Sequence, residues 1–301
     1  MPNSLMRAAQ LATERVHFKE PLKPEDIGFS SNIFMVFGLP AQRLKGNPFV
    51  WEKKNSLYTL SLTKHKDHEI PAGCYARMNQ IFIDTEVKTK NTNVIEIGRS
   101  LHEYAQKLGY SHGGAERELV KQLVNYTTCR LDLTVVDEQL ARHTEISALV
   151  SEGRDFFFDM KNPQQMTITS GRVVLSESYA RYIHKHAAPL DLEVVRTFKR
   201  NPLALDFYRF LAYRVNGLNK TIEFPDRLLF EQLGVAQTQH RETRARVKTI
   251  LRAIQGFWPG LHAVLEDGQF ILSPSDPAIK AKLAKHTPLT ITHTPLDQVL
   301  P

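Results

Sequence analysis

The sequence predicts an α+β protein in which one order of helices and strands occurs twice along the chain. Stretches with helical hydrophobic spacing alternate with short strand-like stretches, and turn-forming residues separate them. The two copies also correspond to each other. Ile95-Glu96-Ile97 matches Ile222-Glu223-Phe224, and Leu108-Gly109 matches Leu233-Gly234. The match is weak, so it predicts a shared architecture and does not establish common descent.

The composition limits what this fold can be. The chain has 301 residues, which suggests roughly two domains, and its 42% hydrophobic and 24% charged residues are typical of globular proteins. There are 39 lysines and arginines against 32 acidic residues, so the net charge is +7. An excess of this size suits a polyanionic partner, and its position along the chain decides whether such a partner is expected.

The first copy lies in the middle of the chain. Its clearest helix has apolar residues at helical spacing and ends at Gly109, which is typical of a C-cap. In chain order, the predicted elements are helix Ala76–Val87, strand Val94–Ile97, helix Arg99–Leu108, turn Ser111–Gly114, helix Ala115–Thr128, strand Arg130–Val136, return strand Arg154–Met160 and helix Ser176–His186.

The second copy begins after Asn201-Pro202, because the residue before a proline is disfavoured in a helix. Asp267-Gly268 between two alternating stretches is a strong hairpin signal. In chain order, the predicted elements are helix Pro202–Asn216, strand Thr221–Phe224, helix Asp226–Leu233, turn Val235–Gln239, helix His240–Gln255 and hairpin strands His262–Leu265 and Gln269–Leu272.

Helix, strand, helix, turn, helix and hairpin is the order of a winged-helix domain. The sequence therefore predicts two tandem winged-helix domains, over residues 29–188 and 189–275. The first 28 residues are polar, and prolines recur after Ser273. We therefore expect a flexible N-terminal arm over residues 1–28 and a C-terminal tail over residues 276–301.

The helix His240–Gln255 has two different faces. On a helical wheel one stripe is basic, and five lysines and arginines stand against the single acid Glu242 between His240 and Arg252. The apolar stripe contains Thr243, Val247, Ile250, Leu251 and Ile254, and the opposite stripe contains Arg241, Ala245, Lys248 and Arg252. A solvated basic face is the plain alternative. The preceding helix and turn and the following hairpin favour a helix-turn-helix that reads DNA.

The chemistry of this helix suits the major groove. Arginine can bond to guanine O6 and N7, and glutamine to adenine N6 and N7. The start of the helix would reach base edges, while Lys248 and Arg252 lie deeper and would meet phosphates. The predicted DNA-binding residues of this domain, which we expect to be the principal reader, are Gln237, Thr238, Gln239, His240, Arg241, Arg244, Ala245, Lys248 and Arg252.

The corresponding helix of the first copy carries a weaker signal. Glu116 and Glu118 dilute its basic charge, so an auxiliary DNA contact and a dimerisation or structural role both stay open. The candidate DNA-binding residues here are Ser111, His112, Arg117, Lys121 and Asn125, with Arg117, Lys121 and Asn125 on an expected exposed stripe.

Other constellations give no support for catalysis. His184 and His186, with Tyr179 or Tyr182, invite comparison with the metal ligands and nucleophile of a nickase. Lys185 stands between the two histidines, however, and the segment has helical spacing. We therefore predict no enzyme activity, no catalytic residue and no metal site. There is no GxxxxGK[ST] loop, so no nucleotide cofactor is expected.

The cysteines and the hydropathy indicate a cellular setting. Cys74 and Cys129 belong to no CxxC pair, and we expect them to be reduced thiols. The chain begins without an apolar leader segment and contains no stretch of about 20 apolar residues. We therefore expect a cytoplasmic protein without a membrane partner.

Three segments resemble the plasmid replication initiators of the RepA type. The strongest resemblance lies in Asn201-Pro202-Leu203-Ala204-Leu205-Asp206-Phe207-Tyr208-Arg209-Phe210-Leu211-Ala212-Tyr213-Arg214. The segment from Ile97-Gly98-Arg99-Ser100-Leu101 to Leu108-Gly109, with Gly113-Gly114, is similar to a second family segment, and Leu272-Ser273-Pro274-Ser275 to its closing one. The resemblance covers residues 70–275, and the loop over residues 137–153 is not matched.

The resemblance implies two tandem winged-helix domains and a non-catalytic function. It implies binding to repeated sites (iterons) in double-stranded DNA at a plasmid origin, deformation and opening of that origin, and recruitment of the host initiator and replicative helicase. A monomer–dimer equilibrium and autorepression are also implied. The alternative is a winged-helix transcriptional repressor without initiator activity.

Overall fold

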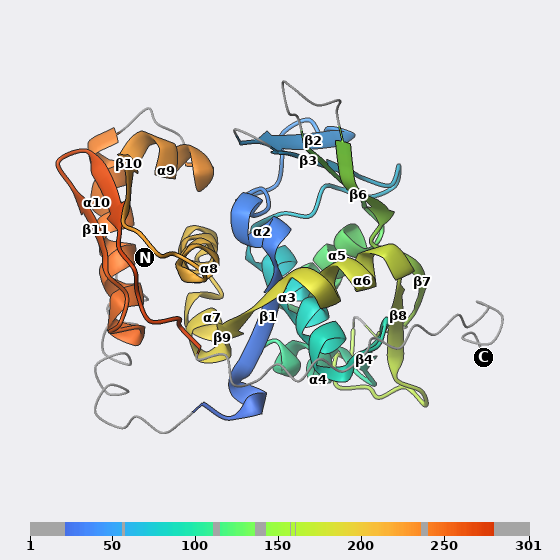
Figure 1. Cartoon of the computed structure of the whole chain (residues 1–301). Coiled ribbons are helices and arrows are strands. Elements are labelled where there is room, and N and C mark those ends of the chain that lie inside the picture. Colours follow the sequence, from blue (N-terminus) through green and yellow to red (C-terminus); the bar gives the residue numbers. More distant parts are fainter. Residues whose placement is uncertain are drawn as a thin grey trace. The chain divides into compact units, whose positions relative to one another are not determined.

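The computed structural model describes residues 22–55, 58–110, 115–135, 143–156, 158–159, 161–235 and 240–279. Helices and strands are mixed throughout this part of the chain (Figure 1), so the predicted α+β class is confirmed. Within the same residues, no helix is both long and apolar enough to cross a membrane. The chain forms two compact units, which are described separately below. The N-terminal unit contains residues 29–33 and 39–187, and the C-terminal unit contains residues 22–28, 34–38 and 188–279.

The C-terminal unit follows the predicted order closely. After β9 (Ala187–Asp191) and the unpredicted helix α7 (Leu192–Phe198), its elements are α8 (Pro202–Val215), β10 (Ile222–Pro225), α9 (Asp226–Gln232), α10 (His240–Phe257), β11 (Ala263–Glu266) and β12 (Gln269–Leu272). The three strands form an antiparallel sheet in the order β10-β12-β11. The hairpin predicted at Asp267-Gly268 is confirmed, and α10 extends two residues beyond the predicted end.

Helix α8 forms the centre of the C-terminal unit. The side chain of Asn201 accepts a hydrogen bond from the backbone N of Ala204 (3.2 Å) and Pro202 occupies the first turn, so the predicted break is the start of a helix. Phe207 and Leu211 are fully buried, and α8 contacts both α7 and α10. Such a helix is apolar on most sides because it is covered on most sides.

The short helix α2 (Asn32–Phe37) was not predicted. Its residues from Phe34 onward belong to the C-terminal unit. There the buried Arg209 side chain donates from Nη2 to the carbonyl of Phe34, and Gln232 donates from Nε2 to the carbonyl of Val36. The chain leaves α2 at Gly38, which has a φ of +65°, and a Cβ atom there would lie 2.7 Å from Oδ2 of Asp206. Only glycine fits at this position, because any other side chain would clash with Asp206.

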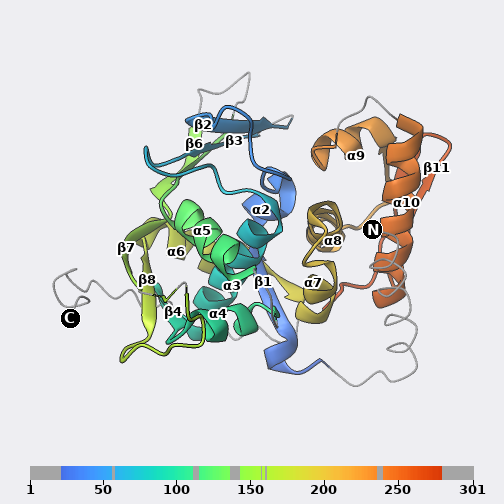
Figure 2. The same ribbon diagram turned by 180° about the vertical axis from the view of Figure 1, so that it is seen from behind.

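The N-terminal unit contains two sheets (Figure 2). Its elements, including β1 (Ile27–Ser31), are β2 (Val50–Lys54), β3 (Tyr58–Thr63), α3 (Gly73–Lys90), β4 (Val94–Gly98), α4 (Leu101–Lys107), α5 (Ala115–Thr127), β5 (Arg130–Val135), β6 (His143–Leu149), β7 (Ser151–Asp155), β8 (Gly171–Leu175) and α6 (Glu177–His186). A four-stranded sheet has the order β2-β3-β5-β6, and a three-stranded sheet has the order β4-β8-β7. Helix α3 contacts α5 and α6.

The hairpin predicted for the first copy was assigned to the wrong pair of strands. The strand from Arg130 pairs with β3 and β6, not with the stretch after Arg154. The hairpin that pairs with β4 is β7–β8, and β8 was not predicted. Alternating polarity identifies a strand but not its partner, and β5 and β6 are inserted between α5 and this hairpin.

With that correction, the two three-stranded sheets have the same connection. In each, the strand before the helix pair lies next to the last strand of the hairpin, as shown by the orders β4-β8-β7 and β10-β12-β11. The predicted turn at Ser111–Gly114 lies outside the described residues, as does the predicted turn at Val235–Gln239 beyond its first residue. Most of the predicted arm and tail lies outside them as well.

Candidate nucleic-acid interface

The orientation of α10 is fixed by its apolar stripe. Val247, Ile250 and Ile254 are fully buried, and Thr243 and Leu251 are nearly so, which confirms the predicted core side. The opposite stripe is turned to solvent: Arg241, Ala245 and Arg252 are exposed, and Lys248 is partly exposed. A helix held in this way presents one basic face, whose direction follows from packing and not from the charges themselves.

Three arginines of α10 are exposed. Among the residues that the structure describes, no carboxylate forms an ion pair with Arg241, Arg246 or Arg252. The nearby acid Glu242 is exposed on a neighbouring part of the helix. Within the described residues, no carboxylate neutralises these three arginines.

Lys248 connects α10 with the hairpin. Its Nζ lies 3.7 Å from Oε1 of Glu266 on β11, and the two side chains are 37% and 61% exposed. A pair at this distance and exposure is screened by water and contributes little to stability. It does place a negative charge beside a residue that was predicted to contact phosphate.

His240 and Arg244, both predicted to contact DNA, face a carboxylate of their own unit. The Arg244 side chain donates from Nε to Oδ2 of Asp226 (2.6 Å), and Nε2 of His240 lies 3.1 Å from Oδ1 of the same residue. The Asp226 side chain is 4% exposed and begins α9. Both side chains therefore join α10 to α9. No pattern in the sequence indicated these contacts, since a helical wheel assigns a residue to a side but not to a partner.

Asp226 also joins the hairpin to the two helices. Its backbone N donates to the carbonyl of Gly268 (2.9 Å), in the turn between β11 and β12. One buried aspartate therefore holds the start of α9, the first turn of α10 and the tip of the hairpin together. This group holds the basic face and the hairpin of the C-terminal unit in one fixed arrangement.

The corresponding helix of the N-terminal unit is partly covered. Asn125 is only 2% exposed and accepts a hydrogen bond from the backbone N of Glu69 (3.3 Å), so the predicted exposed position is wrong. Gln122, also buried, accepts one from the backbone N of Ala72 (2.9 Å). The segment leading into α3 therefore lies across the second half of α5. A helical wheel of α5 could not reveal that these residues are covered, because the covering segment lies about fifty residues upstream.

Lys121 is exposed but already has a carboxylate partner. Its Nζ lies 3.2 Å from Oε2 of Glu69, and Arg43 lies 2.5 Å from the other oxygen of the same carboxylate. Arg117 is exposed in the first turns of α5. Gln237, Thr238, Gln239, Ser111 and His112, which were predicted to contact DNA, lie outside the described residues.

The histidine and tyrosine cluster on α6 is explained by packing. Tyr179 is fully buried with its hydroxyl against that of Tyr126, and burial raises the pKa of both phenols well above the usual value. Tyr182 donates to Oδ1 of Asn32 (2.7 Å), and its ring lies 4.6 Å from that of His186. Over the described residues, no group of three or more His, Cys, Asp or Glu side chains is placed to bind a metal ion.

Comparison with known proteins gives a family and a fold. Residues 70–224, just over half of the chain, match the family model RepA_C, described as plasmid encoded RepA protein. The crystal structure of selenomethionine derivatives of domain 2 and domain 3 of RctB is similar, with a TM-score of 0.53 and 11% sequence identity, over 83% of this chain and 98% of that one. At this identity the likeness concerns the fold alone. Comparison with curated protein sequences gave no match.

Proposed function

The chain belongs to the family of plasmid encoded RepA proteins, and from this we propose that it is the replication initiator of a plasmid. In this proposal it binds repeated sites (iterons) in double-stranded origin DNA, deforms and opens the origin, and recruits the host initiator and the replicative helicase. Self-association and autorepression regulate this activity. The family match ends at residue 224, before α10, so the DNA contacts are argued below from the geometry of α10.

The observation that carries the proposal is the basic stripe of α10. Arg241 and Arg252 are eleven positions apart, so the stripe runs for about 16 Å along the helix. The major groove of B-DNA is about 12 Å wide and admits one helix. Ala245 lies between the cations and leaves room for close approach. Arg241, in the first turn, is the residue we assign to a base edge.

The other cations of α10 serve the phosphates. We assign Lys248 and Arg252, which lie farther along the stripe, to phosphate contacts that position the helix without reading sequence. His240 and Arg244 act indirectly, because their bonds to Asp226 hold α9, α10 and the hairpin in register. Gln237, Thr238 and Gln239 remain candidates for base contacts at the start of the helix.

Bending an origin in this way needs no nucleotide. Smooth bending of a 20–30 base-pair site costs on the order of 1–6 kcal/mol, and the contacts that the bend permits can offset this cost. The binding energy of several phosphate contacts is of the same order. The bending of the origin can therefore rest on binding energy alone.

A transcriptional repressor without initiator activity is the second candidate. It would use the same basic stripe, so the DNA and not the protein distinguishes the two. The test is nuclease footprinting of the DNA that neighbours the gene, with the purified full chain. Several regularly spaced direct repeats would support initiation, a single inverted repeat over a promoter would support repression, and no protected sequence would contradict both.

A further inference from the structure

The loop between β7 and β8 carries the most exposed large apolar side chain among the described residues. Ile168 is 96% exposed, whereas the next in order, Phe49, is 56% exposed. The corresponding turn of the C-terminal unit is a tight one at Asp267-Gly268 and has no apolar residue. The two hairpins therefore share their strand order but differ in what their tips present.

The backbone that leads to Ile168 is held in place. Thr167 donates from its backbone N to the carbonyl of Arg99 (2.7 Å), and Arg99 donates from Nε to the carbonyl of Thr167 (3.1 Å). The backbone N of His102 donates to the carbonyl of Pro163 (2.9 Å). These bonds fasten the loop to the start of α4, so its exposed side chain is displayed from an anchored backbone.

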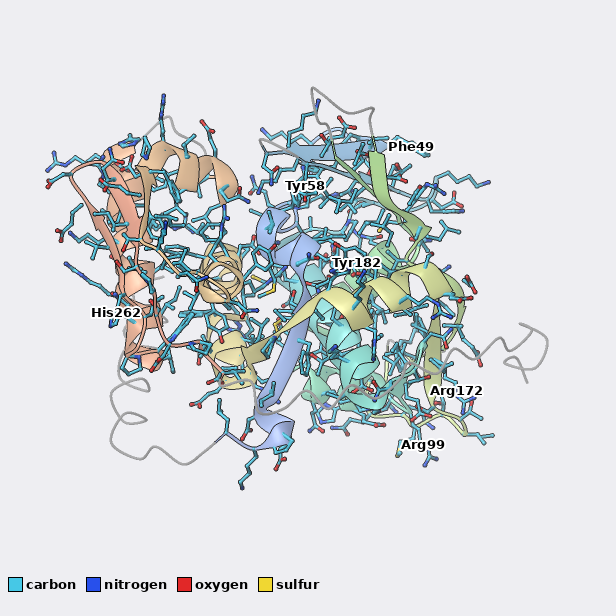
Figure 3. All side chains as sticks on the ribbon, viewed as in Figure 1. Phe49, Tyr58, Arg99, Arg172, Tyr182 and His262 are labelled. Atoms are coloured by element: carbon cyan, nitrogen blue, oxygen red, sulfur yellow. The ribbon has the colours of Figure 1, made fainter. Side chains whose placement is uncertain are left out.

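Cations surround this loop. Arg99, Arg172 and Lys161 are exposed, and Arg99 and Arg172 lie at the same end of the N-terminal unit (Figure 3). Acids lie nearby as well. Glu103 accepts from the backbone N of Arg99 (2.8 Å) and pairs with Lys107 (3.2 Å). Glu96 and Asp155 lie opposite Arg172 on the two neighbouring strands. Asp159 accepts from two backbone N atoms of the loop itself, which lowers the pKa of its carboxyl.

We propose that Ile168 is a wedge that enters the minor groove of the bound DNA and unstacks one base step. Proteins that bind the minor groove frequently insert apolar side chains between base steps, and their arginines and lysines read the groove. Met166 in the same loop is 54% exposed, but Ile168 is the more exposed of the two. Because α5 is partly covered and Lys121 is paired, this loop is better suited than α5 to touch DNA. The inference rests on the proposed function and gives that function its means of distortion.

The test compares Ile168→Thr and Ile168→Val in the full chain. Threonine keeps the branched shape but would bury a hydroxyl between bases, whereas valine removes one methylene. Potassium permanganate, which oxidises unstacked thymines, is applied to a supercoiled plasmid carrying the footprinted DNA. We expect valine to lower permanganate cleavage by about fourfold. Threonine should lower it by more than about tenfold.

Binding itself should change little in these variants. Burial of the side chain and unstacking of the bases oppose each other and are similar in size, so the affinity of Ile168→Thr should stay within about tenfold of the parent. Leu149→Thr, which removes an exposed apolar side chain from β6, is the matched control and should leave the permanganate pattern unchanged. An unchanged pattern in Ile168→Thr, with the footprint retained, would overturn the wedge alone. A parent protein without a footprint would overturn the proposed function as well.

Discussion

Arg244 donates from Nε to Oδ2 of Asp226 over 2.6 Å, so the first turns of α10 are tied to the first residue of α9. Asp226 is almost fully buried, and its backbone N also bonds to the hairpin turn at Gly268. Arg244 of the basic helix therefore forms an ion pair within the protein, while Arg241, one turn earlier, has no such partner among the described residues. Two neighbouring cations of one helix thus have separable roles.

Asp226→Asn should destabilise the C-terminal unit. The change removes the charge that both His240 and Arg244 face, while it keeps the size of the side chain. Since Arg244 is partly exposed, we expect the free energy of unfolding to fall by about 1–2 kcal/mol. The measurement is urea unfolding followed by Trp258, which is buried in this unit, in a Trp51→Phe background.

Asp267→Asn is the control for this change. Asp267 is exposed in the hairpin turn with a φ of 45°, a conformation that asparagine also tolerates. Its unfolding midpoint should match that of the parent. If Asp226→Asn is as stable as the parent, the aspartate does not hold the two helices and the hairpin together.

Arg241→Ala and Arg244→Ala should affect DNA binding differently. We expect loss of Arg241 to cost about 1–3 kcal/mol on the specific site and to relax base preference at one position, with unchanged stability. Loss of Arg244 should lower the unfolding midpoint and weaken binding to specific and scrambled DNA alike, because its contact is with Asp226. Dissociation constants of each variant for the specific DNA and for the scrambled DNA, measured at one salt concentration, distinguish the two roles. If both variants had the same ratio of affinity for specific DNA to affinity for scrambled DNA, the separate roles of Arg241 and Arg244 would be contradicted.

The faces of α10 could be predicted from the sequence, but the partners of its residues could not. Helical spacing identified Val247, Ile250 and Ile254 as the core side, because a buried stripe repeats with the helix period whatever it packs against. Asp226 was assigned only to the start of a helix. Its contact with Arg244 depends on how two helices pack, and such non-local geometry leaves no periodic signal in either helix.

The N-terminal unit shows the same limit for strands and for the second helix. Alternating polarity identified the strand from Arg130 but not its partners. This strand pairs with β3, which precedes it in the sequence, and with β6, which follows it. Likewise, Lys121 was placed on the correct exposed side of α5, but Glu69, which neutralises it, enters from a segment that carried no prediction. The local sequence pattern determines which face of an element a residue occupies, and the tertiary packing determines which residue it contacts.

Glu266→Gln should strengthen binding to DNA of any sequence. Glu266 lies 3.7 Å from Lys248, so removing its charge frees the lysine and also removes repulsion between the hairpin and phosphate. Lys248→Ala should do the reverse and reduce the slope of log affinity against log salt by about one. Affinity measured over a salt series tests both, and the double variant should bind more tightly than Lys248→Ala only by the repulsion that Glu266→Gln removes. An unchanged affinity in Glu266→Gln at low salt would show that the pair does not limit Lys248.

Alkaline pH should destabilise the N-terminal unit through Cys129. Burial raises the pKa of this thiol from 9.0 to about 12, so the folded state holds its proton where the unfolded state releases it. The stabilising contribution is present below pH 9 and is lost as the pH rises from 9 towards 12. At most about 1.4 kcal/mol is lost per pH unit in this window. The buried phenols of Tyr126 and Tyr179 act in the same direction, but only above about pH 10, where unfolded tyrosine ionises.

Cys129→Ala separates the thiol from the phenols. Between pH 9 and 10 the urea midpoint of the N-terminal unit, followed by Trp51 in a Trp258→Phe background, should fall in the parent and stay level in the variant. Cys74→Ala is the matched control, since Cys74 is only partly buried, and it should follow the parent. A parent midpoint that is level from pH 8 to 10, or a Cys129→Ala variant that falls as steeply as the parent, would show that the buried thiol does not govern the alkaline limit.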